Sequence, residues 1–200
     1  MFGFRRFLKQ YELIKIPQRE PWLSGDLDSF TKSEAQDHFE WYVSQYDQRL
    51  GFFRHNVANF YNIPLGKLDY SPESLVTLWE KIRREFRSVK IVEDFSFVKD
   101  DEQIHLKGMD SKYLSPDSIK LVIDVSFYFA RVFIEKYNFI RWEIGSSKYG
   151  SPNWPCLTSF KVALVPEHIV SASAYGFLSG KKKKDLLLEI FLIWEEDLVV

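Results

Sequence analysis

Residues 115–135 read Ser-Pro-Asp-Ser-Ile-Lys-Leu-Val-Ile-Asp-Val-Ser-Phe-Tyr-Phe-Ala-Arg-Val-Phe-Ile-Glu, and this segment is the most informative part of the chain. Ser115 and Pro116 predict a helix start, since a serine hydroxyl caps free N–H groups and proline has no N–H to leave unpaired. The apolar residues that follow occupy nearly every side of the helix: Ile119, Leu121, Val122, Ile123, Val125, Phe127, Phe129, Val132, Phe133 and Ile134. A helix that is apolar all round lies inside a domain, so 116–138 is predicted to be the central helix.

The few polar groups of this helix fall close to one line. Asp124, Arg131 and Glu135 are spaced by seven and four residues, which places them on one side of a helix. We therefore expect this line to face solvent or a site, and Asp124 and Arg131 are candidate binding residues for a pocket beside the helix.

A long helix is predicted over 31–62. Thr31 and Glu34 have the spacing of a capping box, in which each side chain accepts a hydrogen bond from the other's backbone. Apolar residues then recur every three or four positions: Phe39, Val43, Tyr46, Leu50, Phe53, Val57 and Phe60. Gly51 is a possible break. The stripe fits either packing on the core or a coiled-coil seam between two copies, and its aromatic residues favour the core.

A second helix start lies at Ser71-Pro72, with Ser71 as the expected cap. The apolar spacing behind it predicts a buried face of Leu75, Leu78, Trp79, Ile82 and Phe86. Strands are expected at 89–98 and 103–106, joined by a turn at 99–102, and at 140–144 and 158–165. Further helices are expected at 166–178, with Gly180 as its stop, and at 182–198, with Leu187, Ile190, Phe191 and Trp194 facing inward.

These elements predict an α+β fold in a single domain, 1–200. It comprises an N-terminal helix and loop at 1–30, the long helix at 31–62 and an α+β core at 70–200 with a small, mostly antiparallel sheet. Two hundred residues suit one domain, and 46% apolar residues exclude a disordered chain. The lone Cys156 cannot form an internal disulfide.

The charge balance also restricts the possible partners. Twenty-seven basic and 28 acidic residues give a formal charge of −1, which argues against nucleic-acid binding. The longest segment free of charged residues, 168–180, is too short to span a membrane. The basic, aromatic start at residues 1–9 does not continue into the apolar run of a signal peptide, so we expect a docked terminal helix and a cytoplasmic protein.

Residues that would support catalysis do not form a recognisable set. The sequence has no glycine-rich phosphate motif, and its four histidines share no metal-ligand spacing. Cys156 follows a proline and leads into a strand, where nothing lowers a thiol pKa, so we interpret it as an inert buried thiol. We therefore expect no catalytic residues, metal or cofactor, and a protein that is not an enzyme.

Two features are candidate binding surfaces. Trp142, Tyr149 and Trp154 surround a loop at 145–156 that is otherwise rich in turn-forming residues, and large aromatic side chains in loops are typical of recognition sites. The alternative is that they cap the core. The last helix carries Lys181–Lys184 at its start and Glu195–Asp197 at its end, opposite to what the helix dipole favours. These charges are either solvated or complementary to a partner.

Part of the chain resembles a group of small bacterial proteins, some of them considered immunity proteins of toxin systems. The similarity covers about residues 68–157 and lies in Leu68–Leu75 with Trp79, in Tyr128–Ile134, in Trp142 and in Pro155. It departs from the pattern at Ala130 and Arg131, where a glycine and an acid are expected. The resemblance implies a cytoplasmic bacterial protein that acts by binding another protein.

The first hypothesis is therefore a non-enzymatic protein-binding protein, in its specific form an immunity-type protein that neutralises a toxin. The alternative is a small-molecule or peptide-binding module with a pocket beside the 116–138 helix, oriented by Asp124 and Arg131. A third is a hydrolase with an unrecognised site. The oligomeric state stays open.

Overall fold

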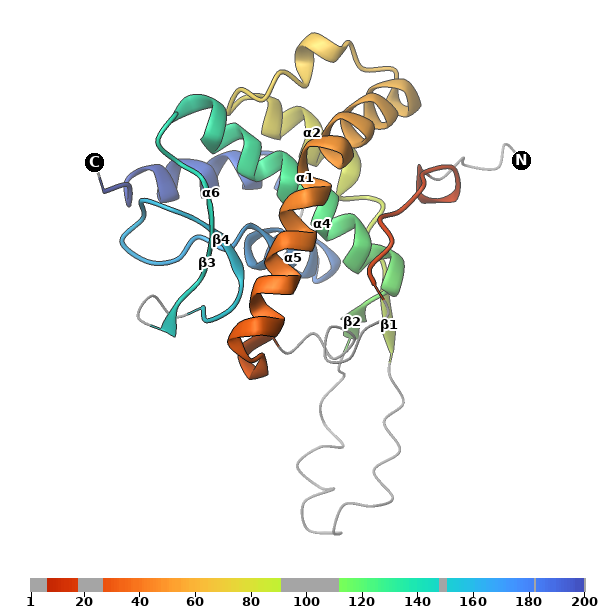
Figure 1. The fold of residues 1–200 in the computed structure, drawn as a ribbon. Coiled ribbons are helices and arrows are strands. Elements are labelled where there is room, and N and C mark those ends of the chain that lie inside the picture. Colours follow the sequence, from red (N-terminus) through yellow and green to blue (C-terminus); the bar gives the residue numbers. More distant parts are fainter. Residues whose placement is uncertain (1–6, 18–26, 91–111, 148–150, 182, 200) are drawn as a thin grey trace.

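The computed structural model describes residues 7–17, 27–90, 112–147, 151–181 and 183–199. Within them the predicted α+β single-domain layout is confirmed: helices surround one central helix, and two small antiparallel sheets lie at the periphery (Figure 1). Among the described helices, none has the length and the apolar character needed to cross a membrane.

The central helix is α4, Pro116–Lys136, and its predicted cap is confirmed. The Ser115 hydroxyl accepts a hydrogen bond from the Ser118 N–H at 3.2 Å. Helices α1 and α5 pack on α4, and Phe127, Phe129 and Phe133 are fully buried. Ile119 was expected to be buried with the other apolar residues of this helix, and that prediction was wrong. Its side chain is 47% exposed, because the first turn of α4 emerges from the core.

Helix α1 runs over Lys32–Tyr61 without a break at Gly51. The capping box is present, with the Thr31 N–H donating to Glu34 at 2.8 Å. From Tyr46 to Val57 the stripe is buried as predicted, within the chain and largely against α4, so the coiled-coil interpretation was wrong. Before Tyr46 the buried side is instead formed by Ala35, His38 and Tyr42, while Phe39 and Val43 are only partly buried.

Helix α2, Ser74–Ile82, buries its predicted face completely: Leu75, Leu78, Trp79, Ile82 and, just beyond it, Phe86. Its predicted cap was wrong. The Ser71 hydroxyl donates to the Asp69 carboxylate at 2.6 Å and accepts no bond from the helix. Residues 72 and 73 form a turn, so the helix begins at Ser74 rather than at Pro72.

The strands are short. Strands β1, Ser88–Lys90, and β2, Lys112–Leu114, pair antiparallel, and most of the hairpin predicted between 89 and 106 lies outside the described residues. Strand β3, Trp142–Ile144, pairs with β4, Pro155–Leu157, with Glu143 opposite Cys156. The strand predicted at 158–165 was wrong. Ser159 has a positive φ of 69°, which breaks an extended strand, and this segment makes two isolated bridges only.

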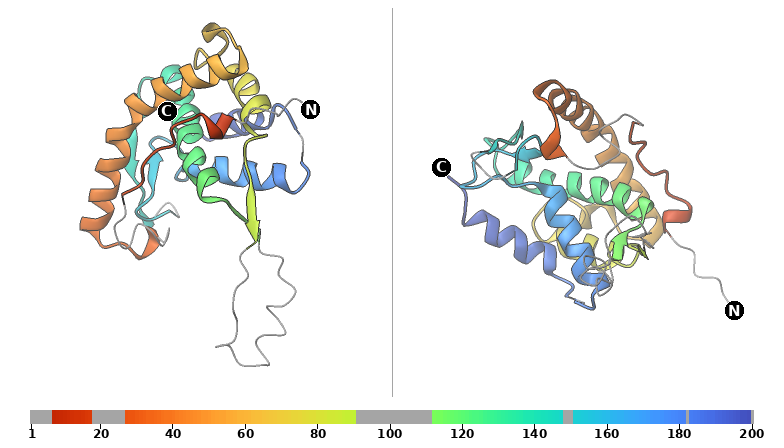
Figure 2. Two further views of the ribbon diagram at one scale, coloured as in Figure 1. Left: turned by 90° about the vertical axis from the view of Figure 1, so that its right-hand side faces the viewer. Right: turned by 90° about the horizontal axis from the view of Figure 1, so that it is seen from below.

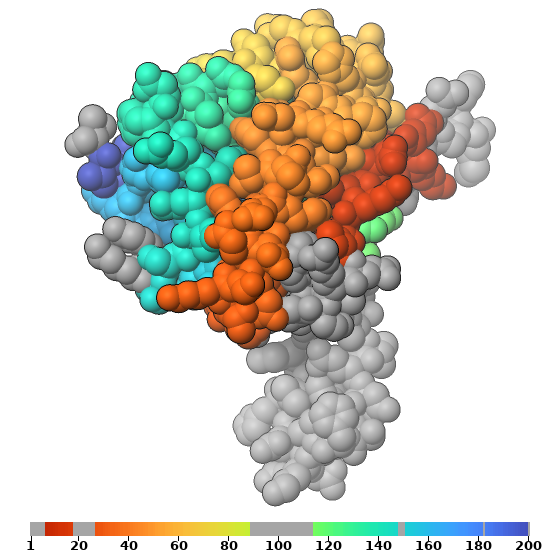
Figure 3. Space-filling view, in the orientation of Figure 1, coloured from red at the N-terminus to blue at the C-terminus, as the bar shows by residue number. Residues whose placement is uncertain are grey.

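Two helices complete the chain. Helix α5, Pro166–Leu178, ends as predicted at Gly180, whose φ of 97° lets the Lys181 N–H bond back to the Gly176 carbonyl. Helix α6, Leu186–Glu195, is shorter than predicted and lies beside α5 at the edge of the molecule (Figure 2). At the other end, Phe7–Lys9 forms a 3-10 turn, and the segment that follows lies against α1 (Figure 3).

Candidate functional site

Trp142 belongs to the aromatic core more than to the surface. It lies on β3 with its indole 5.3 Å from the ring of Tyr42 and 5.6 Å from that of Tyr46, both in edge-to-face geometry. Phe127 of α4 completes this group of rings. The side chain is partly buried, so Trp142 fixes the position of β3 against α1 and leaves only part of its surface accessible.

Trp154 occupies a different position, at the end of the loop that precedes β4, where it contacts the 3-10 turn Leu27–Ser29 and the first turn of α5. Its indole N–H donates to the exposed Asp28 carboxylate at 3.1 Å. Its ring lies 4.3 Å from that of His168, centre to centre, and packs on a small cluster that includes Leu27 and Phe30. Trp154 is thus anchored and partly buried, and Tyr149 lies outside the described residues.

The loop that carries Trp154 is closed tightly at its base. The Gly145 N–H donates to the Trp154 carbonyl at 2.8 Å, and the Asn153 N–H donates to the Gly145 carbonyl at 3.0 Å. A Cβ at Gly145 would collide with the backbone oxygen of Ser151, so only glycine fits this position. Asn153 has a φ of 67°, and its amide donates to the carbonyls of Leu27 and Phe30. This arrangement holds Trp154 in one orientation.

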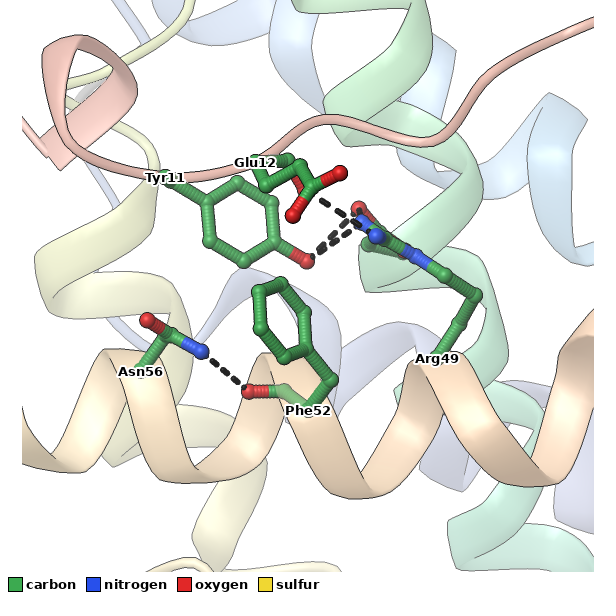
Figure 4. A network of polar contacts seen from close by, with 6 residues as sticks. Tyr11, Glu12, Arg49, Phe52 and Asn56 are labelled. Carbon is green, nitrogen blue, oxygen red and sulfur yellow. Dashed lines mark hydrogen bonds and ion pairs between the residues drawn. The ribbon is translucent and has the colours of Figure 1, made fainter.

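The expectation that Asp124 faces solvent or a pocket was wrong, because it lies fully buried. Arg49 of α1 donates from Nε to Oδ1 at 2.9 Å and from Nη2 to Oδ2 at 2.6 Å, and the Tyr11 hydroxyl donates to Oδ2 at 2.8 Å (Figure 4). Burial raises the pKa of Asp124, and the hydrogen bonds from Arg49 and Tyr11 oppose that shift. Burial also raises the pKa of Tyr11.

Arg131 has other partners than Asp124. It forms an ion pair with Glu135 one turn later on α4, and its guanidinium lies 5.9 Å from the centre of the Tyr70 ring. Asp124 is occupied by α1 and the N-terminal segment, so the two predicted binding residues do not converge on one ligand. A pocket beside the 116–138 helix that these two residues orient together is therefore not supported.

Hollows do lie elsewhere on the described surface, and two of them exceed 400 Å³. The larger, of about 480 Å³, lies along the contact between the N-terminal segment and α1 and is lined by Phe7, Gln10, Tyr11, Asn56, Asn59 and Phe60. The second, of about 410 Å³, lies between the segment after β4 and the C-terminal residues, and its lining includes Glu143, Thr158, Val162 and Val199. Neither is lined by Asp124 or Arg131.

Sequence reasoning missed two titratable side chains with shifted pKa values, Glu167 at the start of α5 and His38 on α1. Withdrawal of the Glu167 carboxyl from water raises its pKa to about 7, and the nearby Tyr42 hydroxyl opposes the shift. Burial lowers the pKa of His38 to about 4. No pattern of spacing marks such groups, since their surroundings come from different elements.

Cys156 behaves as an inert thiol. It is buried in β4, and burial, with a smaller contribution from the Glu143 carboxylate, raises its pKa to about 12. At neutral pH the thiol therefore stays protonated, whereas a nucleophile must be a thiolate. Within the described segments, no three His, Cys, Asp or Glu side chains are grouped so that they could hold a metal ion.

Comparison with known proteins gives no relative for this chain: no family model, no curated protein and no solved structure matches it.

Proposed function

We propose that this protein acts by binding another protein through the Trp154 surface, which we define as Trp154, Asn153, Asp28 and His168. The observation that carries the proposal is the anchored, partly accessible indole of Trp154. Tryptophan is enriched among the residues that dominate binding energy, and these residues act best when their orientation is fixed beforehand. Asp28 and His168 are exposed and supply the polar rim that such an anchor needs.

The narrower proposal concerns the partner. The resemblance of residues 68–157 to immunity-type proteins supports a bacterial, cytoplasmic protein that neutralises a toxin. A non-enzymatic role fits such a protein, because blocking a toxin requires an interface and no chemistry of its own. The buried, protonated Cys156 thiol is consistent with this role.

The test is capture of partners from an extract of the native cell by the immobilised full chain. We expect one protein to be retained specifically and Trp154→Ala to weaken its binding about 30-fold or more, the effect of a hot-spot residue. Phe139→Ala is the matched control, since Phe139 is an exposed aromatic residue away from this surface. We expect it to bind as the wild type does.

A folding control keeps this test decisive. If Trp154→Ala lowers the melting temperature strongly, Asp28→Ala and His168→Ala remove the polar rim while leaving the small core cluster in place. Normal binding by folded variants at all three positions would overturn the Trp154 surface. A toxin encoded beside this gene and bound by the chain supports the narrower proposal, and a captured partner with no toxic activity overturns it.

A second candidate function is binding of a small uncharged molecule in the 480 Å³ hollow. Its volume is in the range of ligand pockets, and it combines aromatic rings with the carboxamides of Gln10, Asn56 and Asn59. Screening a library of neutral fragments by NMR tests this function. Ligands that shift wild-type signals and lose their effect in Asn59→Ala would support it, and a screen without specific binders would reject it.

A further inference from the structure

Helix α6 is more apolar than its packing requires. Apart from Glu189 and Glu195, every residue of Leu186–Glu195 is apolar. The helix packs on α2 and α5 and buries Leu187 and Phe191 completely, yet Leu192 is 47% and Ile193 62% exposed. Figure 2 shows α6 along the edge of the molecule, where its outer side meets no other described element. An apolar helix side of this kind typically marks an interaction surface.

The charges around α6 are arranged in an inverted order. Lys183 and Lys184 precede the helix, and Glu195 and Glu196 lie at its end. About the midpoint between positions 189 and 190, Lys183 mirrors Glu196 and Lys184 mirrors Glu195. Two basic residues before the helix therefore mirror two acidic residues at its end, whereas Asp185 and Glu189 mirror the apolar Trp194 and Ile190. A helix with this order is complementary to a second copy of itself running in the opposite direction.

The apolar side follows the same symmetry. Leu186 and Ile193 also mirror each other about this midpoint, and a separation of seven residues places them on the same side of the helix. Leu186 is partly exposed and Ile193 largely so. A twofold axis through the midpoint would therefore set Leu186 of one copy against Ile193 of the other. Such a contact uses the same patch on both copies, as twofold dimers do.

We infer that α6 forms the seam of a homodimer in which the two copies of the helix pair antiparallel. Among the charges that the seam would use, Lys183, Lys184 and Glu196 are exposed, whereas Glu195 is partly buried and already bonded to Lys136 and Tyr137. Lys183 pairs with Glu189 of its own helix, Lys184 lies 3.8 Å from Glu80, and Glu196 is exposed. Exposed ion pairs of this kind contribute little free energy, so exchanging them for partners across the seam costs little.

The small size of the contact limits the affinity that the dimer can reach. A helix of ten residues is about 15 Å long, and a contact along it falls in the class of small, transient interfaces. We therefore expect a dimer that dissociates in the range of about 10–100 µM. This seam is separate from the Trp154 surface. A result that overturns the homodimer therefore leaves the proposed function unaffected, and the reverse also holds.

The first experiment is analytical ultracentrifugation of the full chain across a concentration series. We expect a monomer–dimer equilibrium, and we expect Ile193→Glu to weaken it at least tenfold. Ile119→Glu is the matched control, because Ile119 is also an exposed isoleucine but lies on α4. A wild-type chain that stays monomeric up to about 500 µM overturns the inference, as does an equal effect of the control variant.

Charge reversal then tests the direction of the pairing. Lys183→Glu alone and Glu196→Lys alone each place like charges across the seam, so each variant should dimerise at least tenfold more weakly than the wild type. Mixed together, the two variants restore opposite charges at both ends and should form a heterodimer near wild-type affinity. The double variant should likewise dimerise on its own. Failure of both the mixture and the double variant to recover overturns the antiparallel pairing.

Discussion

Arg49 of α1 holds both carboxylate oxygens of Asp124, which lies in the middle of the central helix α4. The Tyr11 hydroxyl donates to the same carboxylate, and Arg49 also donates to the Glu12 carbonyl at 3.0 Å (Figure 4). Three segments far apart in the sequence are thereby joined at one buried group. Such a network fixes the N-terminal segment to the core, because a carboxylate left without partners there would be costly.

Removing one member of this network should destabilise the protein strongly. We expect Arg49→Met to lower the free energy of unfolding by about 3 kcal/mol, since it leaves a buried carboxylate without its cation. Urea denaturation measures the loss. In the double variant Arg49→Met, Asp124→Leu the unpaired charge is gone, so much of the stability should return. A double variant as unstable as Arg49→Met would contradict this explanation.

Glu167 should make the protein less stable as the pH rises. Its pKa in the folded state is about 7, above the 4.5 of an unperturbed glutamate, so folding favours the protonated form. The resulting penalty is absent below pH 4.5 and grows until the pH passes 7. Glu167→Gln removes it. We expect the variant to gain about 1–2 kcal/mol relative to the wild type between pH 5 and pH 8, measured by urea denaturation at each pH.

His38 should make the protein less stable as the pH falls. Its pKa in the folded state is about 4, below the 6.5 of an unperturbed histidine, so the unfolded chain binds the proton more readily. The stability that the neutral His38 contributes is therefore fully present above pH 6.5, and it is lost as the pH falls toward 4. His38→Gln should reduce this acid-induced loss by about 1–2 kcal/mol between pH 7 and pH 4.5. Parallel pH trends in the two variants would refute one of the assignments.

Replacing each of the two serines that were predicted to cap helices should now change the stability by different amounts. Ser115 caps α4, so Ser115→Ala should cost about 1 kcal/mol of stability. Ser71 bonds an exposed aspartate instead, and Ser71→Ala should cost less than about 0.5 kcal/mol. Thermal denaturation of the two variants side by side measures the difference, and equal losses would show that Ser71 supports α2 after all.

The sequence predicts those features that depend on neighbours in the chain. The Ser115 cap, the buried face of α2 and the stop at Gly180 all follow from residues within one or two helical turns. Asp124 shows where this reasoning ends. Its spacing to Arg131 and Glu135 indicates a polar line toward solvent, but its partners Arg49 and Tyr11 lie 75 and 113 residues away. Only the tertiary packing brings them together.

In the candidate site too, the sequence predicts one residue, whereas the contacts of that residue depend on tertiary packing. The unusual aromatic content of the loop identifies Trp154 without a structure. Its anchor Asp28 is 126 residues distant, and no local pattern connects the two. The shift of the buried side of α1 from Phe39 and Val43 to His38 and Tyr42 also has a tertiary cause, because Tyr42 packs on Phe127 and Trp142. For the same reason the titrating groups His38 and Glu167 escape detection by spacing.

Phe133 should be among the most sensitive positions in the core. Its ring is fully buried on α4, and its centre lies 4.2 Å from that of Phe191 on α6 and 5.3 Å from that of Phe160. Phe133→Ala removes contacts to both and leaves a cavity, so we expect a loss of about 3–5 kcal/mol. For a chain of this size that corresponds to a melting temperature lower by about 10 °C. Ile119→Ala, on the same helix but exposed, should cost about 0.5 kcal/mol or less. Equal melting temperatures for the two variants would mean that α4 is not the centre of the core.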